Sequence, residues 1–381
     1  MQTFPSRLPE VGTSIFAVMS KMALEHGAIN LSQGFPDFRI DEKLINLVYK
    51  YMLEGHNQYA PMPGLLALRE AIANVMRESY DCVADPETEI TITAGATEAI
   101  FAAIAAFVRA GDEVIVFDPS YDSYEPAIRL NGGVPVHINL VYPEFSVDWD
   151  QVERAVSPRT RMIMINTPHN PSGSVLSDSD LKRLETIAEK NGLIVISDEV
   201  YERLVYDQAV HRSILAYPGL ARRGVAVFSF GKSFHATGWK CGYAVAPPAL
   251  SKEIRKTHQF IVFSVNTPLQ WALAEYMQDP THLTGLSSFY QKKRDFFVNR
   301  LQGSSFEVLP CRGSYFQVLS YSRISSKSDL DMAEELTRTA KVAAIPLSVF
   351  YKDRTDNRLL RFCFAKREDT LERACEILRK L

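Results

Sequence analysis

Two lysines, Lys232 and Lys240, stand close together in a stretch from residue 229 to residue 243 that is rich in glycine and in hydroxyl-bearing residues. The stretch follows the apolar run Val225–Phe228, which predicts a buried strand. A buried lysine with a lowered pKa can form a Schiff base with an aldehyde. A second cation beside glycines and hydroxyl groups suits a phosphate group. The stretch therefore predicts a site for a ligand that carries both an aldehyde and a phosphate.

Pyridoxal 5′-phosphate is such a ligand. The stretch alone leaves a second interpretation open, because most lysines on turns are simply exposed to solvent. The other predicted strands distinguish a cofactor site from exposed lysines on a turn, because ligands of a parallel α/β sheet bind at the carboxyl ends of its strands. The residues that follow each strand are therefore the ones that can meet a single ligand.

Small residues follow the predicted strand 89–93, namely Gly95, Ala96 and Thr97, and they open an alanine-rich helix. Such residues let the backbone approach a phosphate, and the free amides of the first helical turn can bind it. An ordinary strand-to-helix turn is the alternative, so this feature by itself indicates little.

Two polar side chains, Asn170 and Asp198, follow the next apolar runs, 162–165 and 193–196. The amide of Asn170 can meet a ring hydroxyl. A carboxylate directly after a buried strand is costly unless it is paired, and a protonated pyridine nitrogen would pair with Asp198. A helix N-cap is the alternative role for this aspartate. Since four strand ends offer a phosphate cradle, an amide, an acid and a lysine, the sequence predicts a pyridoxal 5′-phosphate site.

The order of predicted elements indicates the fold. From about residue 90, short apolar runs alternate with helical patterns, which is typical of an α/β domain with a mostly parallel sheet. Later the pattern changes to a long predicted helix over 281–301, followed by strands and shorter helices, which indicates a smaller α+β unit. We therefore predict an N-terminal arm and part of the small domain at 1–40, a large cofactor-binding domain at 41–275 and a small C-terminal domain at 276–381.

Composition narrows the class of protein. The chain has 381 residues with an ordinary balance of 46% hydrophobic and 23% charged side chains, and its net charge of −3 gives no reason to expect nucleic acid as a partner. Five cysteines without a Cys-x-x-Cys pair indicate neither a disulfide framework nor a metal site. The N-terminus lacks the layout of a signal peptide, and no apolar run is long enough to span a bilayer. We therefore expect a cytoplasmic protein with no metal and no membrane partner.

The chain resembles the class I aminotransferases of the fold type I pyridoxal-phosphate superfamily, in particular the branch with kynurenine, glutamine-phenylpyruvate and methionine aminotransferases. The segments that carry this resemblance occur in the family's order over nearly the whole chain: 31–38, 59–64, 166–173, 197–201, 229–243 and 361–366. The resemblance implies a large domain with a mostly parallel sheet between helices and a smaller α+β domain. It also implies a homodimer with shared active sites, which moves an amino group from an amino acid to a 2-oxo acid in a ping-pong cycle.

The resemblance further implies a role for each site residue. Lys232 would hold the cofactor covalently and move a proton at the substrate Cα, with Asp198 and Tyr201 as the other catalytic residues. The residues expected to bind the cofactor are Gly95, Ala96, Thr97, Tyr121, Asn170, Asp198, Tyr201, Ser229, Lys232 and Lys240. Those expected to bind the substrate are Gly34, Tyr59, Asn170 and Arg361.

Within these sets, Tyr121 would stack on the cofactor ring, while Asn170 and Tyr201 would hydrogen-bond its 3-oxygen. Arg361 would pair with the substrate α-carboxylate in a bidentate manner. Tyr59 would reach in from the partner subunit, and Gly34 would lie over the carboxylate.

The substrate side chain is less constrained by the sequence. The expected lining is apolar and aromatic, and no second arginine stands in a motif that would select dicarboxylic substrates; this lining is Ile15, Phe16, Tyr59, Tyr121 and Phe350. We therefore expect methionine, aromatic amino acids, kynurenine or glutamine as donors. Two departures from relatives are Lys240, where many have arginine, and Leu347, where a glycine is usual and a bulky residue would narrow the loop near the substrate.

Two alternative functions stay open at this point. The same site chemistry would also serve β-elimination from cysteine S-conjugates, and pyruvate release would distinguish that reaction from amino transfer. A non-catalytic ligand-binding regulator on the same fold is an alternative of another class. Loss of Lys232 or an added DNA-binding segment would favour it, and the sequence shows neither.

Overall fold

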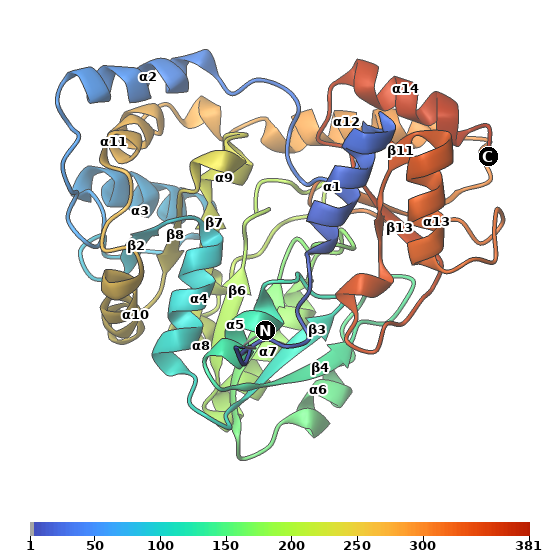
Figure 1. Cartoon of the computed structure of the whole chain (residues 1–381). Helices are drawn as coiled ribbons and strands as arrows, with labels where there is room; N and C mark the ends of the chain where they lie inside the picture. The colour runs from blue at the N-terminus through green and yellow to red at the C-terminus, as the bar shows by residue number, and fades with distance from the viewer. Residues whose placement is uncertain (1–3) are drawn as a thin grey trace.

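The computed structural model describes residues 4–381 and contains a seven-stranded sheet with helices on both faces (Figure 1). Its strands lie in the order β2-β8-β7-β6-β5-β3-β4, and among them β8 runs against the direction of the others. Their bounds are β2 (Ile90–Thr93), β3 (Glu113–Asp118), β4 (Val134–Asn139), β5 (Thr160–Asn166), β6 (Ile194–Asp198), β7 (Gly224–Ser229) and β8 (Gly242–Val245). This mostly parallel sheet between helices confirms the predicted fold class.

Alternate residues of the central strands face opposite helical layers. In β3, Val114 and Val116 belong to one hydrophobic cluster, whereas Ile115 and Phe117 belong to the other. The first cluster includes residues of α4 (Ala96–Phe107), α5 (Tyr124–Leu130) and α10 (Pro248–Ile261), and the second includes residues of α3 (Leu66–Tyr80), α7 (Asp178–Asn191) and α11 (Thr267–Tyr276). Because both faces are covered, the strands are continuous apolar runs rather than alternating ones.

Helix ends agree with the local sequence. Ser177 and Asp180 form a capping box at the start of α7, and Gly192 ends that helix with a left-handed backbone, φ 66°. Further helices of this part are α2 (Glu42–Leu53), α6 (Trp149–Ala155), α8 (Pro218–Ala221) and α9 (Phe230–Ser233). Within residues 4–381, no helix combines the length and the apolar content needed to cross a membrane.

A second group of elements lies on the right in Figure 1. It contains a four-stranded antiparallel sheet in the order β12 (Ile345–Pro346), β13 (Leu359–Cys363), β10 (Phe316–Ser320) and β9 (Glu307–Val308). Helices α12 (Leu286–Arg300), α13 (Asp329–Glu335) and α14 (Glu368–Leu378) accompany it. The N-terminal helix α1 (Ile15–His26) is followed by β1 (Ile29–Asn30), which pairs with β11 (Val342–Ala343). The domain boundaries near residues 40 and 275 stay predictions.

The single long helix expected over 281–301 is wrong. The chain instead forms a short 3₁₀ turn, Pro280–His282, and then α12, with Gly285 between them at φ 81°. A left-handed backbone at this glycine cannot continue an α-helix, so the apolar periodicity runs through a break.

The two groups of elements meet beside the carboxyl ends of the large sheet. A backbone hydrogen bond joins Ser120 N, after β3, to Phe350 O of the second group (2.8 Å). The amide of Lys352 also donates to the Asp118 carboxylate at the end of β3, at 2.7 Å. These contacts hold the loops after the strands against the small sheet, and the functional site lies between them.

Candidate active site

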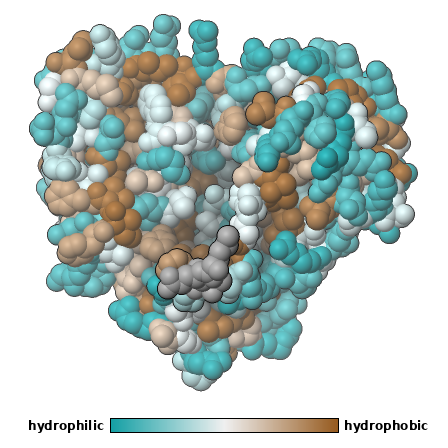
Figure 2. Space-filling view, viewed as in Figure 1, coloured by the Kyte–Doolittle hydropathy of each residue, from teal (hydrophilic) through white to brown (hydrophobic). Residues whose placement is uncertain are grey.

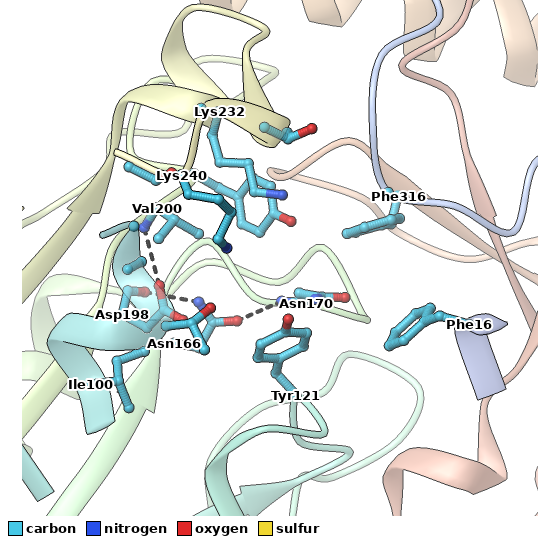
Figure 3. Close-up of a pocket in the computed structure, with 18 of the residues that line it drawn as sticks. Phe16, Ile100, Tyr121, Asn166, Asn170, Asp198, Val200, Lys232, Lys240 and Phe316 are labelled. Carbon is cyan, nitrogen blue, oxygen red and sulfur yellow. Dashed lines mark hydrogen bonds between the residues drawn. The ribbon is translucent and has the colours of Figure 1, made fainter. Parts of the chain in front are cut away.

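A cavity of about 270 Å³ lies where the strand ends of the large sheet face β10 and β13. Figure 2 shows the surface hollowed between the lobe that carries α2 and the lobe that carries α14. In the close-up, Lys232 and Lys240 enter from one side, Asp198 and Asn166 lie on another, and Phe16 stands at the far end (Figure 3). The predicted site residues that line this cavity are Gly34, Gly95, Ala96, Thr97, Tyr121, Asn170, Asp198, Tyr201, Ser229, Lys232, Lys240 and Arg361. The structure therefore brings these twelve residues together around one cavity.

Lys232 lies in the short helix α9, directly after β7, so its side chain starts at a strand end. Burial lowers the pKa of its amine to about 8. Its Nζ donates to the hydroxyl of Tyr315 at 2.7 Å. An amine with this pKa is partly neutral near physiological pH, and a neutral amine is the form that can attack a carbonyl or accept a proton.

Asp198 is the last residue of β6 and is buried at the opposite side of the cavity. Its Oδ2 accepts a hydrogen bond from the Tyr124 hydroxyl at 2.6 Å, and its Oδ1 accepts one from the Val200 amide at 3.3 Å. Burial raises the pKa of Asp198 to about 6, although the Tyr124 bond favours the charged form. A cationic ligand atom beside this carboxylate would offset the cost of its burial.

The phosphate end of the cavity is formed by the start of α4 and by Lys240. Gly95 has φ 79°, and a Cβ built on it would come within 3.4 Å of Lys240 Nζ. The glycine therefore brings the first amides of α4 close to a cation, an arrangement that suits an anionic group. Ser229 and Thr237 add hydroxyl groups to the same lining. These donors fit the phosphate of pyridoxal 5′-phosphate.

Two asparagines connect the strand ends. Asn166 ends β5 and donates from Nδ2 to the backbone oxygen of Asp198 at 2.8 Å. Its Oδ1 accepts from the backbone amide of Asn170 at 2.7 Å. Asn166 therefore fixes Asn170 relative to Asp198. Sequence analysis did not name Asn166, although the rule applied to the other strand ends would have found it.

Arg361 crosses from β13 into the cavity and is almost fully buried, at 1% exposure. Its Nη1 donates to Asn170 Oδ1 at 2.8 Å and its Nη2 to Ser32 O at 3.0 Å. Within residues 4–381, its Nε has no hydrogen-bond partner, and no carboxylate lies within ion-pair distance of the guanidinium. A buried cation with an unused donor suits a carboxylate ligand.

Aromatic rings surround the same guanidinium. Its carbon Cζ lies 3.9 Å from the ring centre of Phe316, 5.2 Å from that of Phe16 and 5.3 Å from that of Phe350. Gln33 donates to the Phe16 backbone oxygen at 2.9 Å, which ties α1 to the loop around Gly34. The cavity end near Arg361 therefore places aromatic rings around the buried guanidinium.

Some expected residues lie elsewhere. Of the described residues, Tyr59 is 84% exposed and does not line the cavity, and Ile15 and Phe350 also lie off its surface. Leu347 is buried in the hydrophobic core and, within residues 4–381, does not belong to the cavity lining. Leu347 therefore does not reach the cavity surface itself, and the expected narrowing of the loop near the substrate stays a prediction.

Three aromatic residues were missed by sequence analysis. Tyr124 bonds to Asp198, Tyr315 bonds to Lys232, and Phe316 stacks on Arg361. Tyr124 is the first residue of α5, Phe316 is the first residue of β10, and Tyr315 directly precedes it. In the sequence, an aromatic residue at such a position is indistinguishable from a core residue. Proximity to the lysine and the aspartate in three dimensions was needed to single them out.

Comparisons with known proteins agree with this geometry. The profile of the family described as "Aminotransferase class I and II" matches residues 26–378. The chain is 51% identical over 377 residues to a methionine aminotransferase of Escherichia coli (strain K12). The aligned part covers 99% of this chain and 98% of that protein. A kynurenine–oxoglutarate transaminase of Dictyostelium discoideum is 32% identical over 410 residues, covering 97% and 94%.

A solved structure also has the same fold as this chain. That of YbdL from Escherichia coli, described as having a methionine aminotransferase function, matches with a TM-score of 0.98 and 50% identity over 100% of both chains. The fold is that of the fold type I pyridoxal-phosphate enzymes. More narrowly, the chain belongs to the class I and II aminotransferase family, and the protein is a pyridoxal-phosphate-dependent aminotransferase.

Proposed function

We propose that this aminotransferase takes the amino group from methionine or an aromatic amino acid and passes it to a 2-oxo acid. The observation that carries this proposal is the apolar end of the cavity, where Phe16, Phe316 and Tyr121 surround the space beside Arg361. Among the described residues that line the cavity, Arg361 is the one arginine, so a second carboxylate would lack a matching fork. The similarity to a methionine aminotransferase and to a kynurenine transaminase supports the same class of donors.

Arg361 would bind the α-carboxylate of every substrate through its free Nε and an adjacent Nη. Asn170, already bonded to Nη1, would help to orient that carboxylate, and Gly34 would lie over it. Because these groups recognise a part that all amino acids share, they define the reaction class. The side-chain preference is left to the aromatic wall.

Asp198 and Lys232 would act on the cofactor ring and on the substrate Cα, respectively. When bound, pyridoxal 5′-phosphate supplies the aldehyde that takes up the amino group and the ring that accepts the charge left at Cα. Asp198 would keep the ring nitrogen protonated, and the neutral amine of Lys232 would take the proton from Cα and return it at the C4′ position. Tyr121 would stack on the ring, and Tyr201 would bind its 3-oxygen together with Asn170.

The phosphate would be held by the amides and side chains at the start of α4 and by Lys240. The residues proposed for this role are Gly95, Ala96, Thr97, Ser229 and Lys240. The N-terminal dipole of α4 and the ammonium group both favour a dianion, so this end would anchor the cofactor while the other end reacts.

A panel of donors under identical conditions tests the substrate class. We expect methionine, phenylalanine and tyrosine to exceed aspartate in kcat/KM, and Phe16→Ala to lower kcat/KM for these donors roughly 10-fold because an apolar contact is lost. Leu24→Ala changes a residue of the same helix that is 84% exposed, so it serves as the matched control. If aspartate were the best donor, and methionine and the aromatic donors inert, the assignment would be wrong.

We also propose a homodimer in which Tyr59 reaches the partner's cavity. Tyr59 packs edge-on against Phe263, with ring centres 5.3 Å apart, and both remain exposed. Phe260, three residues before Phe263, is also 86% exposed. Such a group of exposed aromatic residues is typical of a surface that another protein covers. In most oligomers that partner is a second copy of the same chain. The cytoplasmic location stays a prediction.

Mixing two inactive variants tests the shared site. Lys232→Ala lacks the catalytic amine, and Tyr59→Ala lacks the residue that the partner would receive. In a mixed dimer, one site has Lys232 and an intact partner Tyr59, so random exchange should restore about a quarter of the sites. Each variant mixed with itself is the control. An active monomer by light scattering, or no recovery despite proven subunit exchange, would contradict the proposal.

A further inference from the structure

The hydroxyl of Tyr315 lies between two groups of the active site. It accepts a hydrogen bond from Lys232 Nζ at 2.7 Å, and it also bonds to the backbone oxygen of Gly34. Tyr315 is fully buried at the start of the small sheet, immediately before Phe316. A residue of one lobe therefore holds the amine of the other lobe.

The chemistry of the three groups fixes the direction of both bonds. A carbonyl oxygen can only accept, so the single hydroxyl proton of Tyr315 is donated to Gly34. Toward Lys232, the Tyr315 oxygen is then an acceptor, and the lysine must donate an N–H. A neutral amine held by one N–H keeps its lone pair free for another direction.

The ring of Tyr315 is held in place by its neighbours. Its centre lies 5.0 Å from that of Tyr201, 4.8 Å from that of Phe316 and 6.0 Å from that of Tyr290. The amine of Lys232 lies 5.4 Å from the Tyr201 ring centre and 5.2 Å from the Tyr315 ring centre. Because these aromatic neighbours hold the Tyr315 ring, its hydroxyl has a fixed position and can determine the position of the Lys232 amine.

We propose that Tyr315 is a positioning residue for Lys232, which holds the lysine amine by one N–H whenever it is not bound to the cofactor and leaves its lone pair for the substrate Cα. This inference rests on the proposed role of Lys232 in proton transfer. Lys232 would take the proton from Cα and become an ammonium ion, and the electron pair of the broken C–H bond would remain with the bound substrate, where the cofactor ring would accept the charge. The Tyr315 oxygen can still accept from that ammonium ion, so the same contact serves before and after the transfer.

The link to Gly34 adds a second consequence. Gly34 would lie over the substrate carboxylate, and its carbonyl is tied to the Tyr315 hydroxyl. Lys366 donates to the next carbonyl, that of Phe35, at 2.7 Å, so the loop is held from the small sheet side as well. Tyr315 thus connects the group that binds the carboxylate with the group that moves the proton.

The test compares Tyr315→Phe with Tyr290→Phe in the cofactor-free protein and in the holoenzyme. Tyr290 is also buried, touches the same cluster, and donates its hydroxyl to or accepts from His235 Nδ1 at 2.9 Å, so it is a matched control. In the cofactor-free protein, the pH dependence of Lys232 acylation by acetic anhydride, followed by peptide mass spectrometry, reports the pKa of its amine. Other charged or titratable groups act on Lys232 in both variants, namely Asp198, Lys240, Arg361 and Cys363.

Loss of the acceptor in Tyr315→Phe should lower the Lys232 pKa by about one further unit, because a hydrogen bond to a charged donor is the stronger one. In the holoenzyme, we expect kcat to fall roughly 10–100-fold with a larger isotope effect from α-deuterated methionine, while the cofactor Kd changes little. Tyr290→Phe should show neither effect. Equal unfolding midpoints in urea would show that both variants fold alike.

If the Lys232 pKa and the isotope effect of Tyr315→Phe equal those of Tyr290→Phe, the positioning role is wrong. If Tyr315→Phe shifts the pKa but Lys232→Ala remains active, the contact exists and it is the proposed function of Lys232 that fails. The two failures are therefore distinguishable.

Discussion

Replacement of Lys232 by alanine should leave a folded protein that has lost nearly all amino-transfer activity. The lysine is the amine that burial keeps partly neutral, with a pKa of about 8, in the cavity that also contains Asp198 and Arg361. A positioned proton carrier contributes about 10²–10⁴-fold on its own, so we expect a loss of at least that size in kcat/KM for methionine. Lys252→Ala changes an exposed lysine of α10 and should retain full activity.

Stability of the cofactor-free variant separates loss of chemistry from loss of fold. The pKa of Lys232 is lower in the folded protein than the ordinary value of 10.5, so the folded state binds fewer protons than the unfolded state between about pH 8 and pH 10.5. The charged amine of Lys232 therefore lowers the free energy of unfolding by its full amount below pH 8, and this cost disappears as the pH rises to 10.5. Urea unfolding at pH 7 should show Lys232→Ala no less stable than the parent, apart from the small space it leaves. Near-normal turnover by this variant would contradict the catalytic role.

Asp198→Asn should bind pyridoxal 5′-phosphate yet lose most of its activity. Asparagine keeps an acceptor for the Tyr124 hydroxyl and the shape of the site, but it removes the negative charge that would keep the ring nitrogen protonated. A neutral ring accepts the charge from Cα poorly, so we expect a loss of roughly 10²-fold or more in kcat. Single-turnover rates with methionine measure this step, and turnover close to that of the parent would remove Asp198 from the mechanism.

The same substitution should stabilise the cofactor-free protein at neutral pH. The pKa of Asp198 rises from 3.8 to about 6 on folding, so the folded state binds more protons than the unfolded state between these values. Stability contributed by this site therefore falls as the pH rises from about 4 to 6, and the full cost is present above pH 6. We expect Asp198→Asn to recover up to about 3 kcal/mol there and nothing below pH 4. Equal urea midpoints for the parent and Asp198→Asn at pH 7 would show that burial of the charged carboxylate does not lower the stability of the folded protein.

Much of the site was predictable because the sheet is parallel. Once the apolar runs are recognised as buried strands, the residues that follow them must meet at one edge, and this rule located Asn170, Asp198 and Lys232. Arg361 was different, because a lone arginine in an apolar strand has no pattern of its own. Its assignment depended on resemblance, and the structure supplies a physical reason in its buried, partly unsatisfied guanidinium.

The remaining features depend on contacts that periodicity does not encode. Tyr124 and Tyr315 act through hydroxyl groups on otherwise core-like rings, so only their neighbours distinguish them. Gly285 breaks a helix that its flanking apolar residues predicted to be continuous. Leu347 attracted attention because relatives usually have glycine there, and its burial in the core is a contact that the sequence does not encode. Tyr59 would complete a site only when a second chain is present, so its assignment depends on the resemblance and stays a prediction.

The attachment point of the cofactor can be read directly from the purified holoenzyme. The protein should be yellow, and its visible absorbance should shift when methionine is added without an acceptor. Reduction with borohydride before that addition, followed by digestion and mass spectrometry, should place a pyridoxyl group on Lys232. A label on Lys240, on Lys366 or on any other lysine of an active preparation would contradict the site described here.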